Sequence, residues 1–228
     1  MPTALITGAS RGLGLALARA LASGGWRLVI DARASEDLYR AAEELRELTD
    51  VAAYPGDVAD GWHLDGLVDA AGERIDLLVN NASVLGPSPQ PSLADYPIAT
   101  LAHVYAVNVL APLALAQRAL PRMPDGATIL NVTSDAAVEP YEGWGGYGSS
   151  KAALEQLTAV LAAENPRLRV YAVDPGDMRT RMHQEAFPDE DISDRPPPAD
   201  SVPGLLTLIE GARPSGRYAA KDVERVAA

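Results

Sequence analysis

The chain has 228 residues, a formal net charge of −12 at pH 7, 47% hydrophobic residues and 22% charged residues. This composition is typical of one folded globular domain, and the acidic balance argues against nucleic-acid binding, which needs a basic surface. Cysteine is absent, and the three histidines, His63, His103 and His183, share no metal-ligand spacing. Disulfides, thiolate catalysis and a metal site are therefore not expected.

Short apolar runs alternate with helical patterns along most of the chain. Strands are predicted at 4–7, 28–30, 51–54, 75–79, 128–132 and 170–173. Between them, in chain order, the patterns predict a helix that starts at Leu13 and ends at Gly24, a helix at 35–48, a helix capped by Asp60, and helices at 95–122 and 148–164. Such alternation predicts a single α/β domain, residues 1–228, with a doubly wound parallel sheet covered by helices on both faces. The ligand crevice of such a sheet lies at the carboxyl ends of its strands.

One uncharged stretch, Tyr96–Gln117, is long enough to raise the question of a membrane span. It contains Pro112 and the polar residues His103 and Asn108, whose side chains are unfavourable in the hydrocarbon of a membrane unless they find hydrogen-bond partners. We therefore interpret it as a buried helix. The N-terminus shows no basic region followed by an apolar stretch, so the sequence predicts a cytoplasmic protein without a membrane partner.

The long irregular segment Phe187–Asp200 is rich in proline and acidic residues. Two interpretations stay open for it: a solvated linker, or a substrate lid that spans residues 177–204, since long loops in compact domains often close over sites.

A glycine-rich turn, Thr7–Gly14, joins the first predicted strand to the first helix. Its glycines allow a tight turn close to a pyrophosphate, and the helix N-terminus adds free N–H groups and positive potential. The spacing is Gly-x-x-x-Gly-x-Gly, which differs from the commoner dinucleotide pattern Gly-x-Gly-x-x-Gly. A nucleotide site is the functional interpretation, and a tight turn without a ligand is the alternative.

The end of the second strand carries both Asp31 and Arg33. A carboxylate here would accept hydrogen bonds from a ribose 2′-hydroxyl, as in NAD sites, whereas a guanidinium would bind a 2′-phosphate, as in NADP sites. Arg11 in the glycine-rich turn could reach the same phosphate. Because residues two apart in a strand share a face, the spacing alone leaves both cofactors open.

Tyr147 and Lys151 lie one helical turn apart on the same face of the predicted helix. A phenol with a pKa of about 10 transfers protons poorly at neutral pH, and a nearby ammonium is expected to lower that pKa. Ser134 ends the fifth predicted strand and so reaches the same edge of the sheet, where its hydroxyl could bind a substrate carbonyl oxygen. No histidine or carboxylate pairs with it in a hydrolase motif.

Five motifs follow one another along the chain: Thr7–Gly14, Asn80–Ala82, Ser134, Tyr147–Lys151 and Pro175–Gly176. In this order they resemble the signature of the short-chain dehydrogenase/reductase family, and the resemblance extends to about Thr180. It implies a Rossmann-like fold and an oxidoreductase that transfers a hydride between a nicotinamide and a carbonyl or secondary alcohol.

The resemblance also implies that NADP(H) is preferred to NAD(H). NAD-preferring members carry an acidic residue where Ala32 stands, and NADP-preferring members often carry a basic residue where Arg11 or Arg33 stands. The alternative within the family is an NAD-dependent alcohol dehydrogenase that uses Asp31. A dinucleotide-sensing protein without catalysis is the alternative outside it, but the intact set of Ser134, Tyr147 and Lys151 argues against this.

By the same resemblance, the expected catalytic residues are Asn108, Ser134, Tyr147 and Lys151, with Tyr147 as general acid and base. Asn108 is either a core amide or a residue that holds a water near the lysine. Ser83 stands where the family usually has glycine. The expected cofactor contacts are Gly8, Ser10, Arg11, Gly12, Leu13, Gly14, Arg33, Asp57, Val58, Asn81, Ala82, Tyr147, Lys151, Pro175, Gly176 and Thr180.

The expected partner is a small carbonyl or alcohol substrate. Positions that could face it are mainly apolar or aromatic: Val84, Leu85, Tyr141, Trp144, Met178, Met182 and His183. Members of the family usually pair the helices that here contain Asn108 and Tyr147, so we expect a homodimer, or a tetramer.

Overall fold

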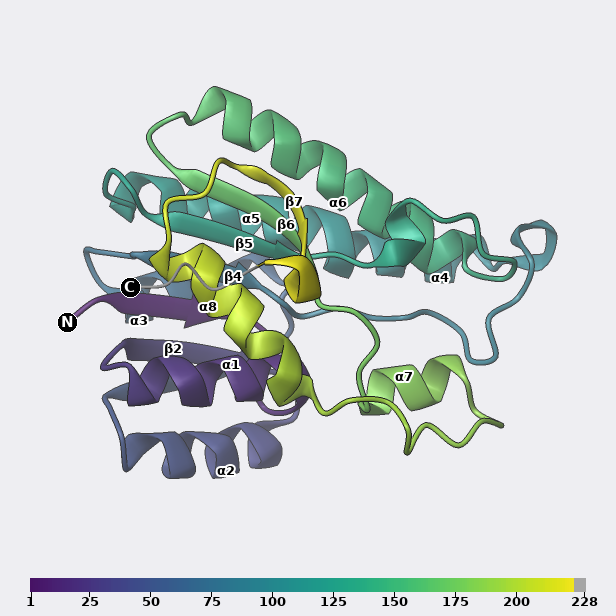
Figure 1. Cartoon of the computed structure of the whole chain (residues 1–228), viewed down its shortest axis with the longest axis horizontal. Helices are drawn as coiled ribbons and strands as arrows, with labels where there is room; N and C mark the ends of the chain where they lie inside the picture. The colour runs from purple at the N-terminus through teal and green to yellow at the C-terminus, as the bar shows by residue number, and fades with distance from the viewer. Residues whose placement is uncertain (224–228) are drawn as a thin grey trace.

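The computed structural model describes residues 1–223 as a seven-stranded parallel sheet with helices on both sides (Figure 1). The strands are β1 (Thr3–Ile6), β2 (Arg27–Ala32), β3 (Val51–Pro55), β4 (Leu77–Asn80), β5 (Thr128–Val132), β6 (Arg169–Asp174) and β7 (Gly216–Ala219). The helices are α1 (Gly12–Ser23), α2 (Ser35–Arg46), α3 (Gly61–Ala71), α4 (Ile98–Tyr105), α5 (Ala111–Ala119), α6 (Gly145–Glu164), α7 (Arg181–Ala186) and α8 (Val202–Glu210). A π-helical turn, Ala106–Leu110, joins α4 to α5.

The strand order is β3-β2-β1-β4-β5-β6-β7. The chain begins near the centre of the sheet, winds outward to β3, and then returns to place β4 on the other side of β1. The segments that leave β1 and β4 therefore run to opposite faces of the sheet, which opens a crevice at their carboxyl ends. The predicted fold class, a single doubly wound α/β domain, is confirmed.

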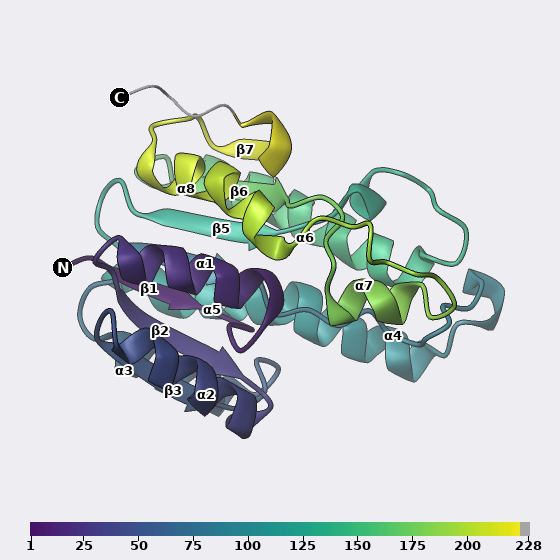
Figure 2. The same cartoon turned by 60° about the horizontal axis from the view of Figure 1, so that its bottom comes forward.

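Each face of the sheet has its own hydrophobic core, because successive strand side chains point to opposite faces. Ile6 of β1 packs in the core beneath α1, α2 and α8, whereas its neighbour Leu5 packs in the core beneath α3 and α5. Figure 2 shows the layer of α1, α2 and α8 in front of the sheet. Both cores fix the strand ends that carry the candidate site.

Local sequence signals account for most of the observed elements. The Asp60 carboxylate accepts a hydrogen bond from the Trp62 N–H at 2.9 Å, so the predicted cap of α3 is confirmed. The predicted helix 95–122 instead starts after Pro97 and is interrupted by the π-helical turn. The edge strand β7 was not predicted, since Gly216–Ala219 contains no apolar run of the kind that the central strands show.

Within the described residues, one helical stretch, Ile98–Arg122, is long and apolar enough to span a membrane by length and composition, with a mean hydropathy of 1.7. Its segment α5 packs against α3, and α4 packs against α6. Val107, Leu115 and Ala119 from this stretch are buried in the core beneath α3 and α5. Packing inside the domain therefore accounts for part of its apolar character.

Candidate functional site

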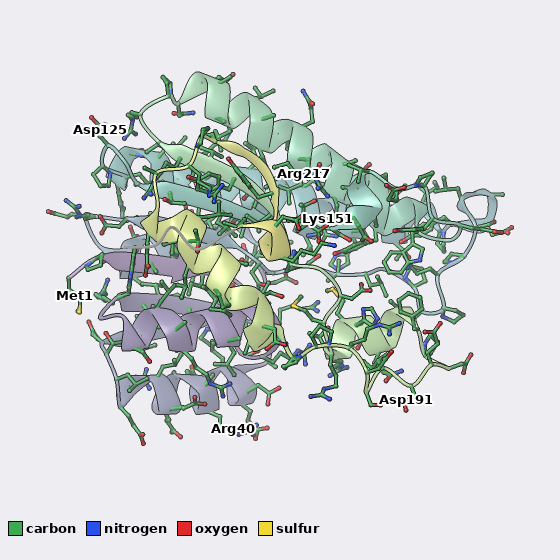
Figure 3. All side chains as sticks on the ribbon, in the orientation of Figure 1. Met1, Arg40, Asp125, Lys151, Asp191 and Arg217 are labelled. Atoms are coloured by element: carbon green, nitrogen blue, oxygen red, sulfur yellow. The ribbon has the colours of Figure 1, made fainter. Side chains whose placement is uncertain are left out.

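A cleft of about 1420 Å³ runs along the carboxyl ends of the strands. Every residue expected to contact the cofactor lines it except Gly14, and Ser134 lines it as well. Asn108 does not belong to its lining. In Figure 3, Lys151 lies toward this edge of the sheet, whereas Met1 and Asp125 lie at the opposite edge. The fold therefore gathers at one edge residues as distant in the chain as Gly8 and Thr180, which are 172 positions apart.

The turn after β1 depends on its glycines. Gly8 and Gly12 have φ values of 66° and 58°, a backbone conformation that side chains disfavour. Gly14 lies so close to the carbonyl of Gly8 that a Cβ atom would overlap it, which explains why Gly14 supports the turn rather than lining the cleft. The amide of Asn81 donates to the carbonyls of Thr7 and Gly8 at 2.9 and 3.0 Å. Asn81 therefore holds the turn in shape from the neighbouring strand end.

The start of α1 offers donors for an anion. No described side chain caps this helix, so its first N–H groups remain available to a ligand. Arg11 and Arg33 line the same part of the cleft. Within residues 1–223, neither guanidinium forms an ion pair or a side-chain hydrogen bond with another residue. A cleft with free N–H groups and two unpaired cations fits a phosphate-bearing dinucleotide.

Asp31, the residue of the NAD alternative, borders the cleft, but its carboxylate is engaged by protein groups. Its carboxylate accepts from the Gly8 N–H at 2.7 Å and lies 2.9 Å from Nε2 of His63, and Asp31 is only 1% exposed. Burial raises the pKa of this carboxyl above its usual range, and the hydrogen bonds from His63 and Gly8 oppose that rise. Asp31 is thus held among protein donors rather than presented to a ribose.

The predicted trio of polar side chains comes together where β5 ends and α6 begins. Tyr147 lies in the first turn of α6 and Lys151 in the next, so both point to the cleft that they line. Nζ of Lys151 donates to the carbonyl of Val132 at 2.8 Å and lies 5.5 Å from the centroid of the Tyr147 ring. Ser134 follows β5 directly and lines the same cleft. The arrangement places a phenol, an amine and a hydroxyl around one space.

Burial is the largest influence on the pKa values of the Tyr147 phenol and the Lys151 amine. It raises the pKa of Tyr147, and the charges of Asp174 and Asp135 act in the same direction. Hydrogen bonds with Ser83 and Ser134 oppose that rise. Burial also lowers the pKa of Lys151 to about 8. The expectation that Lys151 brings the pKa of Tyr147 below its ordinary value is therefore wrong for the protein by itself, because desolvation of the phenolate outweighs the nearby amine.

Asn108 is fully buried, and its side-chain amide is occupied by protein groups. Its Oδ1 accepts from the Val84 N–H at 2.9 Å and from the Ser83 hydroxyl at 3.1 Å. Its Nδ2 donates to the Val84 carbonyl at 2.9 Å and to the Ser150 hydroxyl at 3.0 Å. The side chain therefore acts as a core amide that ties the loop after β4 to α6.

Two polar residues of the site were not predicted to act there. Ser83 donates to Asn108 at 3.1 Å and acts on Tyr147 by lowering its pKa, and its only sequence signal was the departure from the family's glycine. Asp135 accepts from the hydroxyls of Ser134 at 2.9 Å and Tyr141 at 3.0 Å. Tyr141 consequently points to Asp135 and does not line the cleft.

The far end of the cleft is aromatic. The ring of Trp144 lies 5.9 Å from that of Tyr147 and 5.7 Å from that of Phe187, measured between centroids. His183 of α7 stacks at 4.9 Å on Phe187. The other expected substrate-facing positions, Val84, Leu85, Met178 and Met182, also line the cleft. The segment 177–204 thus contributes side chains to this end, as the lid hypothesis requires.

Replacing Lys151 with Met should raise the free energy of unfolding at pH 7 by about 1–3 kcal/mol, although Lys151 belongs to the site. A lysine whose pKa falls from 10.5 to about 8 on folding binds fewer protons in the folded state. The folded state therefore carries the full penalty below pH 8 and loses it as the pH rises toward 10.5.

Urea unfolding of the native protein and Lys151→Met, at pH 7 and again at pH 10, measures this difference. The advantage of the variant should shrink at pH 10. A variant that is less stable than the native protein at pH 7 would contradict the assignment of a desolvated ammonium.

The comparisons with known proteins agree with this geometry. The family model described as short chain dehydrogenase matches residues 2–191. Sepiapterin reductase of Meriones unguiculatus is 35% identical over 199 residues, which are 80% of this chain and 76% of that protein. The rhamnolipids biosynthesis 3-oxoacyl-[acyl-carrier-protein] reductase of Pseudomonas aeruginosa is 35% identical over 78% of this chain and 73% of its own. A short chain dehydrogenase of Shigella flexneri 2a, solved in complex with NADP, superimposes with a TM-score of 0.87 at 29% identity, covering 96% of this chain and 97% of that one.

Proposed function

This chain belongs to the short-chain dehydrogenase/reductase family of oxidoreductases, and we propose that it is an NADP(H)-dependent carbonyl reductase in which Tyr147 is the proton donor. The observation that carries the proposal is the buried Tyr147 phenol beside the Ser134 hydroxyl. Because burial raises its pKa, this phenol keeps its proton at neutral pH. A protonated phenol is the form that carbonyl reduction needs and alcohol oxidation does not.

The cofactor preference rests on the cation pair at the nucleotide end. Arg11 and Arg33 supply planar, permanently charged donors that suit a 2′-phosphate. The carboxylate that would favour NAD, Asp31, is engaged by Gly8 and His63. The glycine-rich turn and the start of α1 supply N–H groups for the pyrophosphate. Complexes with NADP among similar structures support the same preference.

A bound nicotinamide would supply the hydride. Side chains of the protein have the other roles in the proposed reaction. The Ser134 hydroxyl, which donates to Asp135 in the free protein, would turn to donate to the carbonyl oxygen of the substrate, and Tyr147 delivers a proton to that oxygen. Lys151, held by the Val132 carbonyl, keeps a positive charge near the phenolate that then forms. The aromatic and apolar side chains around Trp144 exclude water from the reacting atoms and favour a substrate with an apolar body.

The experiment that tests the proposal is oxidation of NADPH and of NADH, followed by absorbance, across a panel of ketones, aldehydes, quinones and 3-oxoacyl thioesters at pH 7. We expect turnover of at least one carbonyl class and a higher kcat/KM with NADPH. Faster turnover with NADH, or none with either cofactor across the panel, would contradict the proposal.

Ser83 is expected to tune Tyr147. In the neutral site the Ser83 hydroxyl donates to Asn108, and when Tyr147 ionises it can turn to donate to the phenolate, which lowers the pKa of Tyr147. Replacing Ser83 with Gly removes a bond of about 0.5–1.5 kcal/mol, so the pKa of Tyr147 should rise by roughly 0.4–1.1.

Alcohol oxidation measures this effect, since it needs the phenolate and speeds up as the pH rises. The rising limb of its pH profile should move to higher pH in Ser83→Gly. Ser83→Thr, which keeps the hydroxyl, is the matched control and should leave the limb in place. An unmoved limb in the glycine variant would show that Ser83 does not act on the phenol.

A further inference from the structure

A buried acid–histidine pair lies behind the nucleotide end of the cleft. Asp31 is the second-last residue of β2, and His63 is on α3, 32 residues further along the chain. Their side chains meet at 2.9 Å, and Asp31 and His63 are 1% and 9% exposed. The resemblance to the family assigns no role to His63 and gives Asp31 one only in the NAD alternative, and neither motif nor spacing pointed to the pair.

The imidazole ring of His63 has little freedom to move. A Cβ atom on Gly56 would overlap the ring, so the backbone at the end of β3 is in direct contact with it. The ring of Tyr54 lies 6.2 Å away, between centroids, in a tilted arrangement. Because the backbone of Gly56 forms one wall, the ring holds a fixed position, and its Nε2 is directed at Asp31.

The carboxylate of Asp31 is therefore held at both oxygens. One accepts from the Gly8 N–H at 2.7 Å and the other contacts His63. Asp57, which also lines the cleft, is the other acid whose charge acts on Asp31. Without the contact to His63, only the Gly8 N–H would hold this carboxylate, and its other oxygen could turn toward the cleft that Asp31 borders.

A released carboxylate would change the ligand preference of this end of the cleft. It could accept a hydrogen bond from a ribose 2′-hydroxyl, and it would repel a 2′-phosphate. Held against α3, it does neither. We propose that His63 is a positioning residue that determines cofactor specificity, because it retains Asp31 in the protein interior and thereby leaves the 2′-phosphate to Arg11 and Arg33. This inference rests on the proposed preference for NADP(H).

The experiment measures the dissociation constants of NADPH and NADH by titration calorimetry at pH 8. Its readout is the ratio of the NADH constant to the NADPH constant. His63→Leu removes the contact with Asp31, and the ratio should fall about tenfold, as expected for one charge-linked hydrogen bond. In His63→Asn the asparagine side chain is too short to reach Asp31, so this variant should lower the ratio in the same way. It replaces His63→Leu in the experiment if the leucine variant does not fold.

Two further variants test the cause. His63→Gln keeps an N–H donor at a similar reach and should preserve the native ratio. Asp31→Asn combined with His63→Leu removes the carboxylate, and the ratio should return to the native value. Thr158→Val is the control for destabilisation alone, because it removes a buried bond to Asn131 in the core, away from the cleft lining.

The outcomes separate this inference from the function on which it rests. A native protein that binds NADH more tightly than NADPH would overturn the proposed function. A native preference for NADPH that His63→Leu and His63→Asn leave unchanged would overturn the inference. Equal weakening of both cofactors in these variants would also overturn it, since the pair would then only support the fold.

Discussion

Replacing Tyr147 with Phe should abolish carbonyl reduction and leave NADPH binding intact. The substitution removes the proton donor and keeps the ring that packs against Trp144. Positioned general acids contribute about 10²–10⁴-fold, so kcat should fall by at least roughly that factor. The substitution removes no contact that holds the fold, because the hydroxyls that act on the pKa of the phenol, those of Ser83 and Ser134, belong to residues of the cleft lining.

The measurement pairs single-turnover absorbance with a calorimetric titration of NADPH. Tyr218→Phe is the matched control, since its hydroxyl bonds to the Pro214 carbonyl and its ring lies outside the cleft lining. We expect near-native rates in Tyr218→Phe. If Tyr147→Phe retains more than about a tenth of the native kcat, the phenol of Tyr147 is not the proton donor.

The features that sequence reasoning predicted are those encoded locally. Tyr147 and Lys151 share a helix face because they are four residues apart. Short apolar runs in the sequence predict the buried strands β1, β4, β5 and β6. The glycine-rich turn follows from residues adjacent in the chain. These signals place the cleft and most of its lining without any long-range information.

The features that escaped prediction depend on contacts between distant residues. Asp31 meets His63 across 32 positions, and Ser83 meets Asn108 across 25, with no periodicity that links them. The sequence also does not reveal how deeply Tyr147 is buried. An amine one turn away lowers the pKa of a phenol, but burial raises it, and only the packed structure decides which effect is larger.

Replacing Arg11 and Arg33 together with Ala should weaken NADPH binding about 10²–10⁴-fold and change NADH binding little. A hydrogen bond to a charged group contributes about 1.5–3 kcal/mol, and two guanidinium groups are available to one 2′-phosphate. NADH lacks that phosphate, so it loses only weak long-range attraction. The unpaired state of both side chains within residues 1–223 means that their removal leaves no buried acid uncompensated.

Titrations with both cofactors at two salt concentrations measure the effect, since screening weakens exposed charge interactions. Arg40→Ala is the matched control: Arg40 is exposed on α2, pairs with Asp37 at 3.1 Å, and lies on the far side of that helix from Lys151 (Figure 3). If both guanidinium groups bind the same phosphate, the single substitutions should not add up to the double one. Equal losses for NADPH and NADH would instead mean that the arginines hold the pyrophosphate, and the preference for NADP would need another source.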